Sequence, residues 1–206
     1  MGREEGTRCR LPEGDGGGRF IPQGFEHFEH EGRRFLAMEF VQGRTLEQVL
    51  EEAGQPLPWR QVVEWAIQVC DALELFHSQD PPLILRDIKP SNVLVVGDQL
   101  KLASDTVRAI GDSEAGGSAE DDVRSLGAML SEALTRIPPS AGDAAGQVEW
   151  PATMSASFRD VVTRCLSHDS RNRPTVASLD SWLRGEPLAT DPPAPAPEST
   201  PAPESR

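Results

Sequence analysis

The stretch LRDIKPSNVLV, residues 85–95, sets an acid, a lysine and an asparagine in one short polar run between two apolar segments. A carboxylate such as that of Asp87 can accept a proton or hold Mg²⁺, and the carbonyl of Asn92 can bind a hard cation. Lys89 can lie against a phosphate, and Pro90 stiffens the turn. The set suits phosphoryl transfer, in which a protein mainly positions groups and balances charge. On spacing alone, a polar turn with a locally satisfied aspartate is an equally good interpretation.

The composition is that of a globular domain. Of 206 residues, 37% are hydrophobic and 26% are charged, and a folded block of about 150 residues buries roughly 70% of its unfolded surface. The sequence has no apolar run of about 18 residues and no secretory signal, so we expect no membrane span. The net charge of −13 argues against a nucleic acid partner, because phosphate contact needs a basic surface. The cysteines, Cys9, Cys70 and Cys165, form no metal spacing or disulfide framework, which favours a reducing cytoplasm.

Composition divides the chain into three parts. Residues 1–19 are rich in glycine and charge and predict a disordered arm. Residues 187–206 are rich in proline and alanine and predict an extended, disordered tail. The spacing of its prolines suits a partner that binds polyproline, although a plain linker or tail is the interpretation we favour. The folded domain is expected between these two parts, at residues 20–186.

Within the domain, apolar periodicity predicts a little β structure followed mostly by helices, an α+β architecture. One hairpin is expected around residues 20–41 with its turn at Glu31-Gly32, and a second pairs 93–96 with 100–103 around Gly97-Asp98. Helices are expected at 45–54, 58–78, 121–134 and 157–166, and after Pro174. Two capping boxes are predicted, Thr45 with Gln48 and Ser157 with Asp160.

The run RDIKPSN resembles the catalytic loop of protein kinases, Arg-Asp-x-Lys-Pro-x-Asn, in its serine/threonine form. The resemblance covers roughly residues 20–185: MEFVQG (38–43) is similar to the hinge, residues 122–134 to the helix that anchors the loop, and RCLSHDSRNRPT (164–175) to the late Arg-Pro signature. The whole looks most like the helical C-lobe and hinge of a bacterial serine/threonine kinase, with a remnant of the N-lobe sheet. Small-molecule kinases of the aminoglycoside type share the fold but usually lack the Lys-Pro pair, so they match less well.

The resemblance implies a role for each matching residue. Asp87 and Lys89 correspond to catalytic residues, and Asn92 and Asp105 to metal ligands for Mg²⁺ bound with ATP. The nucleotide is expected at four positions, Met38 as gatekeeper, Glu39, Val41 and Leu94. Structural roles fall to Leu85, which replaces the family histidine, to Asp122 and to the buried guanidinium of Arg173.

The departures from the family pattern are equally informative. We find no Gly-rich loop followed by a Val-Ala-x-Lys strand, and the only lysines are Lys89 and Lys101, the latter where the family also places an exposed lysine. Ser104 stands where the metal-binding aspartate is expected, Asp105 comes one place late, and no Ala-Pro-Glu lies between it and Asp122. Loss of one preorganised charge-stabilising group costs about 10²–10³ in rate. Several such losses together predict a rate that is lower by several orders of magnitude. For the same reasons we expect Mg·ATP binding to be weak or absent.

Three interpretations follow. The first is a catalytically impaired, pseudokinase-like module that regulates or binds a protein partner, for example an active kinase. The second is a serine/threonine kinase whose N-lobe is supplied by a partner or was lost through a misplaced gene start, and DNA upstream of Met1 would decide it. The third is a decayed product without function.

Two contacts are also expected. The Asp122 carboxylate should accept backbone N–H groups of the catalytic-loop turn, the alternative being a helix cap that faces solvent. Arg173 should pair with Glu120 in place of the missing family glutamate, the alternative being a side chain that reaches solvent.

Overall fold

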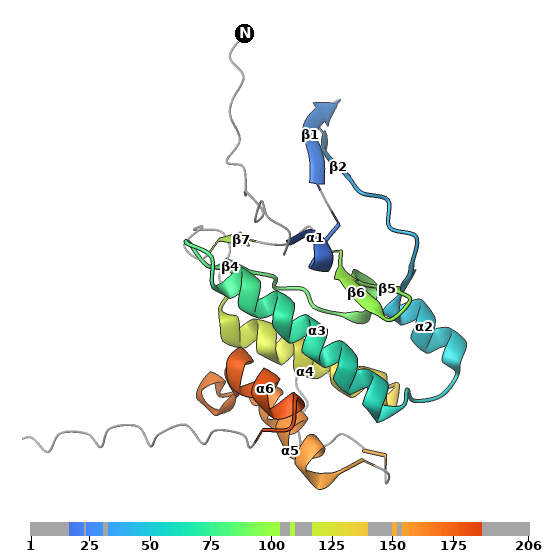
Figure 1. The fold of residues 1–206 in the computed structure, drawn as a ribbon, viewed down its shortest axis with the longest axis vertical. Helices are drawn as coiled ribbons and strands as arrows, with labels where there is room; N and C mark the ends of the chain where they lie inside the picture. The colour runs from blue at the N-terminus through green and yellow to red at the C-terminus, as the bar shows by residue number, and fades with distance from the viewer. Residues whose placement is uncertain are drawn as a thin grey trace, which may run out of the picture.

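The computed structural model describes residues 17–22, 24–30, 33–103, 108–109, 117–139, 150–151 and 154–186. Within these ranges a helical body carries three small antiparallel sheets, in the orders β1-β2, β3-β5-β6 and β4-β7 (Figure 1). This mixture of helices and small sheets agrees with the predicted α+β class. In the part of the chain described, no helix is long and apolar enough to cross a lipid bilayer.

The first hairpin pairs β1 (Gly24–His30) with β2 (Arg33–Met38) and projects from the helical body (Figure 1). His30 lies opposite Arg33, and the predicted turn at Glu31-Gly32 lies outside the described residues. A short helix, α1 (Gly17–Phe20), precedes it and contacts α3 and β6, with Phe20 buried. The helix begins three residues before the predicted domain start at residue 20. Residues 1–16 and 187–206, which hold most of the predicted arm and the predicted tail, lie outside the described ranges.

The second sheet joins β3 (Arg44–Thr45), β5 (Val93–Val96) and β6 (Gln99–Leu102). Gly97 has a φ of 64° in the tight turn between β5 and β6, a left-handed conformation that glycine adopts without strain. This confirms the predicted hairpin, although the second strand starts one residue earlier than expected. Thr45 and Gln48 form the predicted capping box at the start of α2 (Leu46–Ala53).

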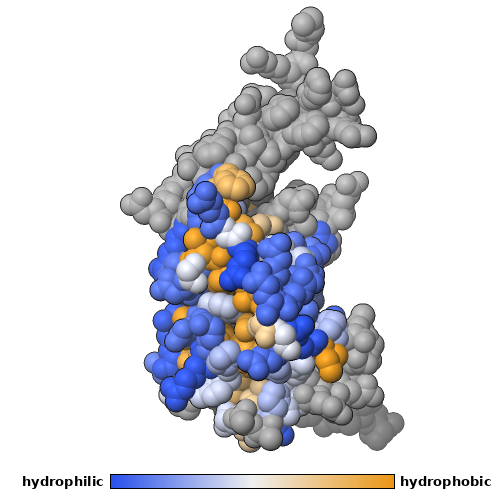
Figure 2. All heavy atoms as spheres, turned by 90° about the vertical axis from the view of Figure 1, so that its right-hand side faces the viewer, coloured by the Kyte–Doolittle hydropathy of each residue, from blue (hydrophilic) through white to orange (hydrophobic). Residues whose placement is uncertain are grey.

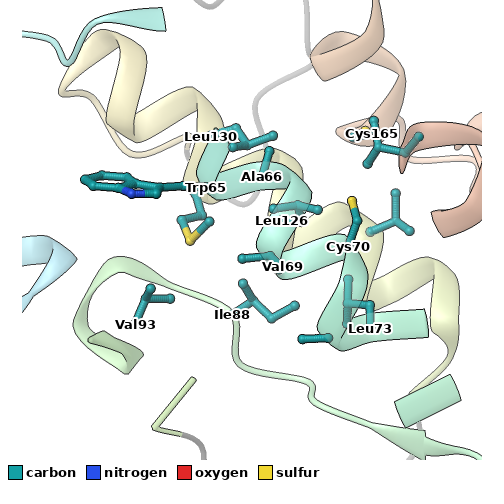
Figure 3. Close-up of a cluster of buried hydrophobic side chains, with 14 of the residues drawn as sticks. Trp65, Ala66, Val69, Cys70, Leu73, Ile88, Val93, Leu126, Leu130 and Cys165 are labelled. Atoms are coloured by element: carbon teal, nitrogen blue, oxygen red, sulfur yellow. The ribbon is translucent and has the colours of Figure 1, made fainter. Parts of the chain in front are cut away.

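The body consists of α3 (Trp59–His77), α4 (Ala119–Thr135), α5 (Ala156–Cys165) and α6 (Val176–Leu183). Along α3, Trp65, Val69 and Leu73 belong to one core with Leu126 and Leu130 of α4 (Figure 3). Each fully buried aliphatic side chain contributes about 1.5–3 kcal/mol. This core is the base on which the polar run of residues 85–95 lies, because Ile88 and Val93 are buried in the same cluster (Figure 3).

One predicted cap is wrong. Helix α5 begins at Ala156, and its N-cap is Ser155, whose hydroxyl accepts a hydrogen bond from the N–H of Phe158 at 3.2 Å. Ser157 lies inside the first turn instead. Both serines are suitable N-cap residues, and use of the earlier one starts the helix two residues ahead of Phe158, which is buried.

The face on the right-hand side of Figure 1 carries α2 and the β5–β6 hairpin. Figure 2 shows this face, where polar side chains surround a narrow apolar strip. Three large hydrophobic side chains of the described ranges are exposed, Phe40, Trp59 and Ile137.

Candidate functional site

The polar run begins directly after β4 (Leu83–Ile84), which pairs with β7 (Arg108–Ala109). Leu85 is only 1% exposed and packs in the core. The next residue, Arg86, has a φ of 62°, in the left-handed region that side chains other than glycine rarely adopt. Such a conformation persists only where the surroundings hold it. The backbone therefore turns sharply between Leu85, which points inward, and Asp87, which is partly exposed.

The group that holds this turn is Asp122, in the first turn of α4. Its carboxylate is fully buried, with Oδ2 accepting the N–H of Leu85 at 3.0 Å and Oδ1 accepting the N–H of Arg86 at 2.7 Å. Hydrogen bonds to a charged group contribute about 1.5–3 kcal/mol each. The expected contact between Asp122 and the loop backbone is therefore present, and the alternative of a solvent-facing cap is not.

His77, the last residue of α3, was missed by the sequence reasoning. Its Nε2 lies 2.8 Å from Oδ2 of Asp122, and its side chain is 15% exposed. The two residues are 45 positions apart, and no spacing rule connects them. The only sequence signal was a histidine at the end of an amphipathic helix just before the polar run.

Asp87, Lys89 and Asn92 come together in the loop. The Nζ of Lys89 lies 2.8 Å from Oδ2 of Asp87. The Nδ2 of Asn92 donates to the same oxygen at 2.9 Å and to the backbone carbonyl of Asp87 at 3.0 Å. The 3₁₀ turn η1 (Pro90–Asn92) sets this spacing. The Asp87 carboxylate is 38% exposed, so it stays reachable from solvent while two neighbours hold it.

The four positions assigned to a nucleotide lie around the β3-β5-β6 sheet and the connection that leads to it. Met38 ends β2, and its side chain lies outside the described part. Val41 is half-buried in the connection from β2 to β3. Leu94 lies on β5 opposite Lys101 of β6. The Lys101 ammonium binds both oxygens of Glu39, at 2.9 and 3.0 Å.

Lys101 therefore differs from expectation. Its side chain is only 19% exposed, whereas the resemblance predicted an exposed lysine. The bidentate contact with Glu39 ties the segment after β2 to β6, which explains why the ammonium is drawn inward.

The metal positions are only partly described. Asp105 and Ser104 lie outside the described ranges, so the structure does not place them. Across the ranges that are described, no three His, Cys, Asp or Glu side chains are grouped as metal ligands. Mg²⁺ prefers several oxygen ligands in octahedral geometry. Asn92 contacts Asp87 through Nδ2 alone, so the oxygen donors described here are the Asp87 carboxylate and Oδ1 of Asn92, and two side chains do not complete an octahedral site.

Arg173 is buried, with 6% of its side chain exposed, and it makes charge-assisted contacts to α4. Its Nη1 lies 3.1 Å from Oδ1 of Asp121 and donates to the backbone carbonyl of Glu120 at 2.9 Å. Its Nε donates to the carbonyl of Ser167. The predicted pairing with the Glu120 carboxylate is wrong. Successive residues of a helix point about 100° apart, and the packing of α4 turns Asp121 rather than Glu120 toward the guanidinium.

Comparison with known proteins shows which family part of the chain resembles. Residues 18–105 match the family model of the protein kinase domain. The matched segment contains β1 to β6 and the whole polar run, and the mixture of helices and small antiparallel sheets is consistent with a protein-kinase-like fold.

The chain is similar to several proteins that are named kinases. The chain is 31% identical over 181 residues to the serine/threonine-protein kinase PknB of Mycobacterium leprae, and the alignment covers 70% of this chain and 29% of that protein. The PknB of Mycobacterium tuberculosis strain H37Rv is 29% identical over 182 residues, with the same coverages. The Aurora kinase of Dictyostelium discoideum is 27% identical over 191 residues, or 78% of this chain and 49% of that protein. The chain thus spans less than a third of the length of its bacterial relatives.

Proposed function

We propose that this chain is a protein-kinase-like module that regulates or binds another protein and has little catalytic power of its own. The proposal rests on the contrast between a loop whose shape is held and a metal position that lacks its carboxylate. Asp122 holds the loop of residues 85–92 in a defined shape, while Ser104 occupies the position where the resemblance calls for a metal-binding aspartate. A shape that is kept without its metal ligand suits binding better than phosphoryl transfer.

The lysines support this proposal. The chain contains two, Lys89 and Lys101, and both bind carboxylates in the structure, those of Asp87 and Glu39. A lysine that neutralises phosphate charge in a transition state must direct its ammonium at the phosphate. Both ammonium groups already face a carboxylate, which offsets the positive charge that each could offer a phosphate.

The partner that we propose is a protein, such as an active kinase. The net charge of −13 disfavours nucleic acid for the electrostatic reason given above. Mg²⁺ and ATP remain the family's cofactors, and we expect this chain to bind them weakly or not at all.

The test measures Mg·ATP binding by calorimetry and self-labelling with γ-labelled ATP on the full chain. We expect no labelling above that of Asp87→Asn, and binding too weak to saturate. Ser104→Asp restores the carboxylate and should strengthen Mg²⁺-dependent ATP binding, whereas the uncharged Ser104→Asn should not. Self-labelling of the unmodified chain that disappears in Asp87→Asn contradicts the proposal.

A second candidate is a serine/threonine kinase whose nucleotide cover comes from elsewhere. It is favoured by the first hairpin, because in the described part of the chain β1 and β2 pair only with each other, and a lone two-stranded hairpin is marginally stable in water. In-frame coding sequence upstream of the Met1 codon that specifies a Gly-rich loop and a Val-Ala-x-Lys strand would favour this candidate. So would labelling that appears only when a second polypeptide is added.

A further inference from the structure

A pocket of about 340 Å³ opens between the end of α3, the start of α4, the 3₁₀ turn η3 (Ser170–Asn172) and the start of α6. It lies apart from the cluster of Asp87, Lys89 and Asn92. Its apolar lining comes from four side chains, Ala119, Val123, Pro174 and Val176, and Arg171 lies at its edge. His77 also lines it.

This pocket is linked through His77 to Asp122, the group that holds the loop of residues 85–92. The His77 ring that lines it contacts Asp122, and Asp122 binds the backbone of Leu85 and Arg86. An occupant of the pocket therefore lies one side chain away from the loop anchor.

The chain itself carries a matching segment. The sequence Pro-Ala-Pro-Glu-Ser occurs at residues 195–199 and again at 201–205. Proline and alanine present apolar surface, and a proline-rich segment is extended before it binds, so little conformational entropy is lost. Each repeat also supplies one carboxylate, Glu198 or Glu204.

The geometry lets this segment return to the pocket. Helix α6 ends at Leu183, and Gly185 follows it with a φ of 102°. The N–H of Glu186 donates to the carbonyl of Ser181, and this turn directs the chain away from the helix axis. Helix α6 has 8 residues and is therefore about 12 Å long. The nine residues from Glu186 to Pro195 span up to about 28 Å when extended. The first repeat is thus long enough to return from the end of α6 to its start, where the pocket lies.

Charge sets the orientation of the segment. Asp169 binds Nε and Nη2 of Arg171, at 3.0 and 2.8 Å, and no residue of the described ranges accepts a bond from Nη1. The Arg171 side chain is 87% exposed, so a second carboxylate can approach that edge. Hydrogen bonds from Arg171 lower the pKa of Asp169, which keeps the existing pair charged. Glu120 lines the α4 side of the pocket and repels a carboxylate there, so the glutamate of a repeat must lie on the η3 side.

We propose that one Pro-Ala-Pro-Glu-Ser unit of the chain's own C-terminal segment docks in this pocket. Its prolines and alanine lie on the apolar walls, and its glutamate binds Arg171. Docking covers the exposed edge of His77 and so stabilises the contact with Asp122.

The experiment places a nitroxide at position 200, between the two repeats, in the full chain with the changes Cys9→Ser and Thr200→Cys. Cys70 and Cys165 are fully buried and should not take the label. Paramagnetic broadening of backbone amide signals is then measured by NMR. We expect loss of signal at residues 119–123 and 170–176 and none at 46–53 in α2.

Three variants test the specific contacts. Arg171→Gln, the pair Glu198→Gln with Glu204→Gln, and the pocket-filling Ala119→Leu should each abolish the local broadening and shift the His77 ring signals. Arg60→Gln, at an exposed arginine on α3, is the matched control and should change neither. Broadening spread evenly over the surface, or unchanged by all three variants, overturns the proposal. A mixing experiment provides a further test, in which a ¹⁵N chain without nitroxide is mixed with a ¹⁴N chain that carries the nitroxide. Broadening of the ¹⁵N signals in this mixture also overturns the proposal, because the segment then occupies the pocket of a second copy.

Discussion

The imidazole Nε2 of His77 lies 2.8 Å from Oδ2 of Asp122 and joins the end of α3 to the start of α4. The same oxygen accepts the N–H of Leu85. One buried carboxylate therefore binds a side chain at the end of α3 and two backbone amides in the loop after β4. Because a buried donor without a partner costs about 1–3 kcal/mol, the contacts of this carboxylate should be strongly interdependent.

Asp122→Asn should lower the free energy of unfolding by about 2–3 kcal/mol, because an amide nitrogen replaces an oxygen that accepts a backbone N–H. It should also increase hydrogen exchange at residues 85–87. Chemical denaturation and exchange on the full chain measure both effects. Glu120→Gln is the control, since its exposed side chain should change stability by no more than about 0.5 kcal/mol. An unchanged denaturation midpoint for Asp122→Asn would mean that the anchor contributes nothing.

Leu85→Ala should destabilise the chain by about 2–5 kcal/mol, the usual range for a large-to-small change in a core. The side chain is 1% exposed, and its loss leaves a cavity beneath the loop. Leu94→Ala is the comparison, because Leu94 is half-buried on β5 and should cost less. Equal melting temperatures for Leu85→Ala and the unmodified chain would contradict the packing described for Leu85.

A double-mutant cycle should find coupling between Arg173 and Asp121. The expected coupling is about 0.5 kcal/mol or more, measured from Arg173→Met, Asp121→Asn and the double variant. The same cycle with Glu120→Gln should give additive effects, because Glu120 offers Arg173 its backbone carbonyl and not its carboxylate. Coupling to Glu120 without coupling to Asp121 would restore the original prediction.

The buried thiols should be inert in the native chain. Burial raises the pKa of Cys165 to about 12 and that of Cys70 well above its ordinary value, and only the thiolate is reactive. Iodoacetamide at pH 8 should modify neither until denaturant is added, as mass spectrometry can show.

The raised pKa also predicts alkaline sensitivity. Below the ordinary pKa of 9.0 both states keep the Cys165 proton, so the stabilisation is complete. As the pH rises from there to about 12, the unfolded state loses the proton first and stability falls. Cys165→Ala should show a smaller decline over this range. Rapid modification of Cys165 at pH 8 would show that the α4–α5 contact opens readily.

Helices with a strong apolar stripe were predictable from sequence. The stripe on α3 gave bounds within one residue of Trp59–His77, because burial of one face determines where the helix runs. The capping box at Thr45 was equally clear, since both halves of the pattern lie within four residues. Ser155 was missed because the neighbouring Ser157 satisfies the same local rule.

The site was predictable only where its residues are close in sequence. Asp87, Lys89 and Asn92 fall within six residues, and a tight loop brings them together whatever the rest of the chain does. The contacts of His77 and the partner of Arg173 depend on how helices distant in sequence are rotated against one another. Local patterns carry no information on that rotation.

The loop anchor also bears on the order of folding. The segment that matches the kinase domain ends at residue 105, yet the residue that fixes its loop is Asp122, 37 positions beyond Leu85. Contacts between residues so distant in sequence form late, because the intervening chain must first be closed into a loop. Strands β5 and β6 can therefore pair early, while Arg86 acquires its left-handed backbone conformation only when α4 docks. A ribosome must synthesise well past the matched segment before the loop has its native shape, and a fragment that stops at residue 105 should keep the hairpin without the loop.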